Sequence, residues 1–161
     1  MIVTKFIALE GTAILAQIKE KELLQHYCSD IVREAKLFKE HISVIEEAEA
    51  LKDANVILHD LSRGGILSGL WEIGEKTGMG MDIDMRKVPI KQETVEICEF
   101  ISLNPYCLLS GGAMLVIALS EKGIPGAVVG YLNPGNDRII RFGETKGFLN
   151  RPAADEIYKI I

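Results

Sequence analysis

The feature that most constrains the fold is an unbroken apolar run at residues 113–118, which directly follows a Ser-Gly-Gly turn. A run of this length is typical of a buried strand and too short for a buried helix. Further strands are predicted where short apolar or alternating segments lie between polar turn residues, at 2–9, 55–60, 79–83, 126–131 and 138–142. The chain therefore needs helices to cover the faces of a sheet.

Apolar residues at helical spacing supply those helices. The pattern predicts helices at 12–27, 29–38, 44–51, 66–73 and 89–101, and one closing helix in the tail from Pro152. Strand and helix patterns intermix along 161 residues, a length that suits one compact domain. The residues by themselves thus predict a mixed α and β fold with helices packed on a sheet.

Composition excludes several classes of protein. With 48% hydrophobic residues the chain can bury a core, and no window holds the roughly 20 unbroken apolar residues of a membrane helix. A net charge of −5 without a basic run predicts neither nucleic-acid nor membrane binding. Three cysteines without a C-x-x-C pair predict no disulfide framework and no zinc site, which suits a cytoplasmic protein. Cys98 falls on the buried face of a predicted helix and is not expected to act as a nucleophile.

Residues 59–65 (His-Asp-Leu-Ser-Arg-Gly-Gly) join a predicted strand to a predicted helix. Paired glycines let the backbone approach a ligand, and the first turn of a helix attracts anions. Asp60, at the end of the strand, could hold Mg²⁺ that bridges to phosphate oxygens, or it could simply cap the loop. The spacing leaves both interpretations open.

Two further segments are candidates for the same chemistry. The turn Ser110-Gly111-Gly112 either approaches a ligand or is only a tight turn that enters a central strand. Glu10-Gly11-Thr12 begins a helix, where Thr12 could contact an anion or act as an ordinary N-cap. Because residues 55–60 and 113–118 are predicted to be neighbouring strands, we expect the two glycine turns to meet at one edge of the sheet.

Three segments, taken in order, resemble the C-terminal domain of the aminoimidazole ribonucleotide (AIR) synthetase superfamily, with the closest likeness to hydrogenase expression/formation (maturation) proteins and AIR synthase-related proteins. They are residues 9–16, 59–66 and 110–116. The resemblance implies an α+β fold, a three-layer α/β/α sandwich on a mixed β-sheet with partial ferredoxin-like topology. It also implies that residues 1–161 form a single C-terminal domain, and that the usual N-terminal ATP-binding domain is absent from this chain.

The chemistry implied by the resemblance is ATP-dependent phosphoryl activation of an oxygen atom, with Asp60 as the catalytic carboxylate facing Mg²⁺. The implied phosphate and substrate contacts are Glu10, Gly11, Thr12, Ser62, Arg63, Gly64, Gly65, Ser110, Gly111 and Gly112. ATP and Mg²⁺ would bind the full-length protein, not this domain alone, which is expected to be inactive by itself. The implied partners are the chain's own N-terminal domain, a second copy in a homodimer, and a small-molecule or carrier-protein substrate.

The chain departs from the family pattern in three places, and the first two favour an alternative, a non-catalytic interaction or regulatory module that retains the fold. The hydrogenase maturation protein ends in a cysteine, whereas this chain ends in Ile161, and it has a carboxylate in the turn that is Ser110-Gly111-Gly112 here. The family also has a crossover helix where this chain has only residues 119–123 between two predicted strands. A parallel crossover needs a dozen or more residues. The short connection predicts either a hairpin or an omission of residues from the sequence, and we favour the omission.

Overall fold

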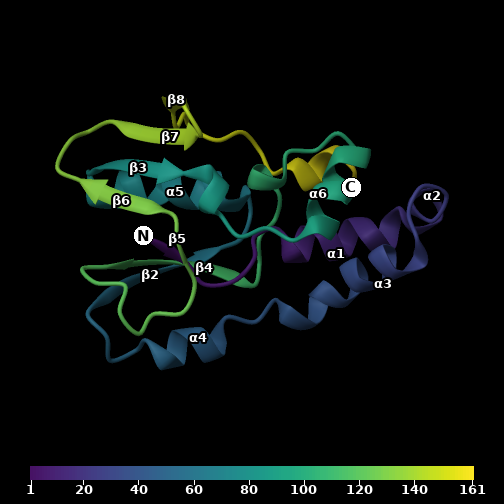
Figure 1. Ribbon diagram of the computed structural model, residues 1–161, viewed down its shortest axis with the longest axis horizontal. Helices are drawn as coiled ribbons and strands as arrows, with labels where there is room; N and C mark the ends of the chain where they lie inside the picture. Colours follow the sequence, from purple (N-terminus) through teal and green to yellow (C-terminus); the bar gives the residue numbers. More distant parts are fainter.

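A computed structural model describes all residues, 1–161, and shows two four-stranded sheets with helices around them (Figure 1). Sheet A has the order β2-β4-β1-β5, and every neighbouring pair in it is antiparallel. Its strands are β1 (Ile2–Val3), β2 (Val56–Leu61), β4 (Ala113–Ala118) and β5 (Ala127–Val128). The prediction that the segments at 55–60 and 113–118 are neighbouring strands is confirmed, although β2 lies at the edge of the sheet.

Sheet B has the order β6-β3-β7-β8 and is mixed, because β3 and β7 run parallel while the other pairs are antiparallel. Its strands are β3 (Gly80–Asp84), β6 (Gly130–Asn133), β7 (Arg138–Phe142) and β8 (Thr145–Phe148). The α+β class with a mixed sheet is therefore confirmed. The single strand predicted at 126–131 is wrong: β5 and β6 belong to different sheets, and between them the Val129 N–H donates to the Met1 carbonyl.

The helices follow the predicted pattern with two corrections. They are α1 (Leu9–Ile18), α2 (Glu20–Leu23), α3 (Ser29–Leu37), α4 (Ile45–Ala50), α5 (Gly65–Thr77) and α6 (Gln92–Phe100). The helix predicted at 12–27 is divided at Lys19, where the backbone leaves helical geometry. The closing helix is only a 3₁₀ turn, Glu156–Lys159.

The predicted strand at 2–9 is also wrong, because only Ile2–Val3 is a strand. Ala8 takes a left-handed conformation with φ 59°, and its N–H donates to the Ser110 hydroxyl at 2.9 Å. That turn starts α1 at Leu9. A contact with a residue 102 positions away thus ends an extended segment that local pattern would have continued.

The core has one large cluster, a smaller cluster of four buried residues and a third cluster of three, Leu9, Ala13 and Phe38. The large cluster joins α5 to the inner faces of both sheets, with Leu61, Leu70 and Met81 fully buried. The smaller cluster packs α4 against the opposite face of sheet A, around Met114 and Val116. α1, α3 and α6 gather at the end of the molecule away from β6 (Figure 1). No helix in the structure combines the length and the apolar character needed to cross a bilayer.

The connection from β4 to β5 is neither a hairpin nor a helical crossover. Both strands are antiparallel to β1, which lies between them, so they run parallel to one another. Residues 119–126 make this connection as a loop, in which the Leu119 side chain is 98% exposed. A short loop suffices for two reasons. It passes over a single strand, β1, and it has only a short distance to run back along the sheet because β5 has two residues.

Candidate functional site

The structure brings the three candidate segments together at one end of sheet A. The Ser110 N–H donates to the Ser62 carbonyl at 3.0 Å, and the Gly11 N–H donates to the Leu109 carbonyl at 3.0 Å. The Ser110 hydroxyl is fully buried, accepts from Ala8 and donates to the Leu108 carbonyl at 2.8 Å. We call segments 8–12, 60–65 and 108–112 the glycine-turn site.

The close backbone approach expected of the glycines is present, but the neighbour is protein. Gly65 has φ 62°, and a Cβ there would lie 2.5 Å from the Tyr106 carbonyl oxygen. Gly112 has φ 100°, and a Cβ there would lie 2.6 Å from the His41 carbonyl oxygen. At both positions glycine is needed for a left-handed backbone and for packing against another loop.

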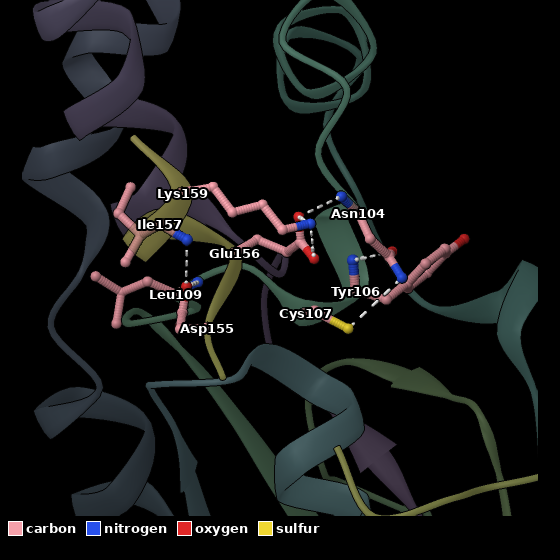
Figure 2. Close-up of polar contacts among 8 residues, drawn as sticks. All are labelled: Asn104, Tyr106, Cys107, Leu109, Asp155, Glu156, Ile157 and Lys159. Carbon is pink, nitrogen blue, oxygen red and sulfur yellow. Dashed lines mark hydrogen bonds and ion pairs between the residues drawn. The ribbon is translucent and has the colours of Figure 1, made fainter. Parts of the chain in front are cut away.

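A buried carboxylate that the sequence analysis missed sits at this site. Asp155 is 4% exposed and accepts three backbone N–H groups: Gly64 at 2.6 Å, Leu109 at 3.2 Å and Ile157 at 2.9 Å. Figure 2 shows its bonds to Leu109 and Ile157. The N–H of Gly64, at the start of α5, was predicted to bind phosphate. In the structure it is bonded to the chain's own Asp155 carboxylate instead. Asp155 is the N-cap of the turn Glu156–Lys159, and an Asp just before the predicted closing helix is a capping signal that could have flagged it in the sequence.

Asp60 lies on β2 opposite Met114 and is exposed. Strand alternation puts it on the α4 side of sheet A, whereas Leu61 faces the core around α5. Partial burial raises the pKa of the Asp60 carboxyl above its ordinary value, and the charge of neighbouring His59 opposes that rise. The chain holds no cluster of three side chains able to ligate a metal ion. A magnesium site is therefore not complete on this chain.

The other candidate residues divide into exposed and buried sets. Ser62 and Arg63 are exposed, and Arg63 makes no ion pair, so its guanidinium is free. The Glu10 carboxylate is half-buried and lies directly over Gly111, in the space that a side chain at 111 would take. Thr12 is fully buried inside α1, so it is not an N-cap, and its hydroxyl donates to Thr94 at 2.9 Å.

The C-terminal segment is also tied to the 3₁₀ turn Pro105–Cys107 (Figure 2). Glu156 pairs with Lys159 at 2.6 Å and accepts the Asn104 N–H at 3.4 Å. Burial raises the pKa of the Cys107 thiol, and the carboxylates of Glu156 and Asp155 add to the effect. Burial likewise raises the pKa of Cys98 to about 12, so both thiols stay protonated at neutral pH, as poor nucleophiles do.

The chain is similar to known proteins both in sequence and in fold. Carbamoyl dehydratase HypE from Rhodobacter capsulatus is 32% identical over 106 residues, which are 66% of this chain and 29% of that protein. The crystal structure of Escherichia coli HypE matches 96% of this chain and 50% of its own, with a TM-score of 0.74 at 18% identity. A structure of the hydrogenase maturation protein HypE in complex with ATP matches 97% of this chain and 51% of its own, with a TM-score of 0.65 at 16% identity.

The chain thus spans about half the length of the solved structures, and these share its fold. The sequence family described as "AIR synthase related protein, C-terminal domain" matches residues 1–135, which include all three segments of the glycine-turn site. The chain therefore belongs to the AIR synthase related family, of which it carries the C-terminal domain.

Proposed function

We propose that this chain is the C-terminal domain of an ATP-dependent enzyme of the AIR synthase related family, and that it helps to bind nucleotide phosphates and substrate while an oxygen atom is phosphorylated. The observation that carries the proposal is the meeting of three loops through the bonds of Ser110 to Ser62 and Ala8. A relative with the same fold is described in complex with ATP.

The exposed groups of the glycine-turn site carry the proposed contacts. Arg63 has a free guanidinium, whose planar fork suits phosphate oxygens. Ser62 offers a hydroxyl beside it, and the backbone at Gly111 is partly open. Asp60 would supply one carboxylate to a metal ion whose other ligands come from a second domain. Stabilisation of the transferring phosphoryl group would then depend on positioned charges from both domains.

The alternative, a non-catalytic interaction or regulatory module, is favoured by one specific observation. The N–H of Gly64 at the start of α5, where a phosphate would bind, already holds Asp155. In a module of this kind the glycine turns would serve packing alone. Variants of Asp60 and Arg63 would then leave nucleotide binding by the intact protein unchanged.

The test is calorimetric titration of Mg–ATP into the longest form of the protein that its gene encodes. We expect measurable binding, weakened about tenfold or more by Arg63→Ala because a phosphate loses a charge-assisted hydrogen bond. Arg33→Ala is the matched control, since Arg33 is an exposed arginine of α3 that pairs with Asp30 outside the site. No Mg–ATP binding by the longest form, or equal effects of the two substitutions, would refute the proposed function.

A further inference from the structure

The outer face of sheet B carries side chains that reach water. Met81 and Ile83 of β3 are fully buried on the inner face, so strand alternation puts Asp82 and Asp84 on the outer face. The strand register then sets two rows on this face. One row is Tyr131, Asp82, Ile139 and Phe148, and the other is Asp84, Arg141 and Lys146. An aromatic side chain thus stands at each end of the first row, where Tyr131 is 67% exposed and Phe148 is 64% exposed.

The charges of this face are sorted by strand. β3 carries the acids, Asp82 and Asp84, whereas β7 and β8 carry the bases, Arg141 and Lys146. Asp82 accepts the Nε and Nη2 groups of Arg141, which leaves the Nη1 group of this guanidinium free. Asp84 accepts three bonds from Arg86, fewer than the roughly four that a carboxylate can take. Both strands can therefore still bind a group of opposite charge.

We propose that the outer face of sheet B binds the same face of a second copy of this chain, around a two-fold axis that runs along the strands between β3 and β7. This axis places β3 of one copy over β7 of the other, and β6 over β8. Asp84 then faces Arg141 of the second copy, and Tyr131 faces Phe148 of the second copy, and the symmetry repeats each contact. Sheets that pack face to face keep their strands aligned in this way, within about 30°.

The charge layout disfavours the other two-fold arrangement of the same faces. An axis across the strands would place β3 over β3 and β7 over β7. The carboxylates of the two copies would then lie opposite each other, and so would the basic side chains, and like charges in contact oppose association. The axis along the strands pairs unlike charges and also brings the two aromatic side chains together. Charge complementarity therefore selects a second copy as the partner and fixes its orientation.

The area of the face predicts a weak dimer. Four strands about 4.8 Å apart and about five residues long span roughly 20 Å by 16 Å. Two such faces bury on the order of 1,000 Å², which is near the lower limit for a specific interface. We therefore expect a monomer with a wet outer face at about 5 µM and a dimer above about 0.1 mM. The proposal involves no nucleotide and is independent of the proposed function.

The experiment is sedimentation equilibrium of the chain from about 5 µM to about 1 mM at low ionic strength, a range over which we expect the wild type to pass from monomer to dimer. Asp84→Lys and Arg141→Asp each place like charges opposite one another twice, so each variant alone should have a dissociation constant raised about tenfold or more. In an equimolar mixture of the two variants, both contacts between the copies join unlike charges again. A mixed dimer should then form with an affinity close to that of the wild type.

Asp30→Lys is the matched control, because it makes the same change of charge on α3, which lies away from sheet B (Figure 1). The Asp30 side chain is 70% exposed, and we expect this variant to associate as the wild type does. A wild-type chain that stays monomeric throughout the range would overturn the proposal. Equal weakening by Asp84→Lys and Asp30→Lys, or no association in the mixture of the two charge variants, would overturn it too.

A second pair of variants keeps the proposal testable if a charge reversal prevents folding. Phe148→Ser removes an aromatic side chain from the proposed contact. Tyr158→Ser removes one that is 52% exposed in the C-terminal 3₁₀ turn, outside that contact. We expect Phe148→Ser to raise the dissociation constant about tenfold and Tyr158→Ser to leave it unchanged. Equal effects of these two substitutions would place the interface elsewhere and contradict the proposal.

Discussion

The glycine-turn site and the outer face of sheet B use polar groups in opposite ways. At the glycine-turn site, Ser110 and Asp155 are buried and are bonded to backbone from distant segments. On the outer face of sheet B, Asp82 pairs with Arg141, and their side chains are 37% and 41% exposed. The difference predicts that an added side chain is costly where the glycine-turn site packs backbone against backbone, and that most changes on the outer face of sheet B are tolerated.

The outer face of sheet B also lacks a covering helix. Strand register places Tyr131, Asp82, Ile139 and Phe148 in one row across its four strands. Tyr131 is 67% exposed and Phe148 is 64% exposed. Water reaches this face, so charge interactions on it are screened and weak.

The largest effect should come from Gly65→Ala. A left-handed alanine costs about 1–2 kcal/mol, and the 2.5 Å approach of its Cβ to the rigid Tyr106 carbonyl adds a clash of about 1–3 kcal/mol. We expect a loss of about 3 kcal/mol in the free energy of unfolding, measured by urea denaturation.

Gly147→Ala in β8 is the matched control for this substitution. Nothing lies within 4 Å of a Cβ there, and the backbone is not left-handed. We expect a change of less than about 1 kcal/mol, in the stabilising direction, because alanine restricts the unfolded chain. Equal losses at the two glycines would mean that the contrast between the regions is wrong.

Much of this contrast could be predicted from the sequence. The apolar run at 113–118 and the segment at 55–60 were expected to be neighbours, and their pairing as β4 and β2 brings Ser62 to Ser110. The glycine turns were therefore expected to meet, and they do. Local pattern sufficed because adjacent strands place their flanking loops side by side.

The rest depends on contacts between residues far apart in the chain. Asp155 bonds to Gly64 across 91 positions, and nothing near residue 155 reveals that partner. The end of the first strand at Ile2–Val3 and the passage between sheets at Val129 are likewise set by bonds to Ser110 and Met1. Periodicity cannot report such contacts, since it measures only local spacing.

The second largest effect should come from Thr12→Val. Thr12 and Thr94 are fully buried and bonded to each other, so removing one hydroxyl leaves the other without a partner. We expect a loss of about 1–3 kcal/mol in the free energy of unfolding. The double variant Thr12→Val/Thr94→Val should be less destabilised than the sum of the single changes. Full additivity in this cycle would show that the hydroxyls do not depend on one another.

Gly111→Ala should have a smaller effect, although Gly111 also belongs to the glycine-turn site. Its backbone is not left-handed, and the nearest atoms belong to the flexible Glu10 side chain, which can move away. We expect a loss below about 1 kcal/mol. In a Glu10→Ala background the loss should vanish or reverse, because the obstacle is gone. A persistent loss in that background would place the obstacle in the backbone instead.

The smallest effect should come from Asp82→Asn on the outer face of sheet B. The Arg141 guanidinium donates to this carboxylate and lowers the pKa of Asp82 below its ordinary value. A lowered folded pKa stabilises the protein above the unfolded pKa of about 3.9, and this stabilisation is lost as pH falls through the folded pKa. Because both side chains are more than a third exposed, solvent screening limits the difference between wild type and Asp82→Asn to about 0.5 kcal/mol at neutral pH. Urea denaturation across the acidic range should show this difference shrinking towards zero, and a difference that grew on acidification would mean that the pair is shielded from water as Asp155 is.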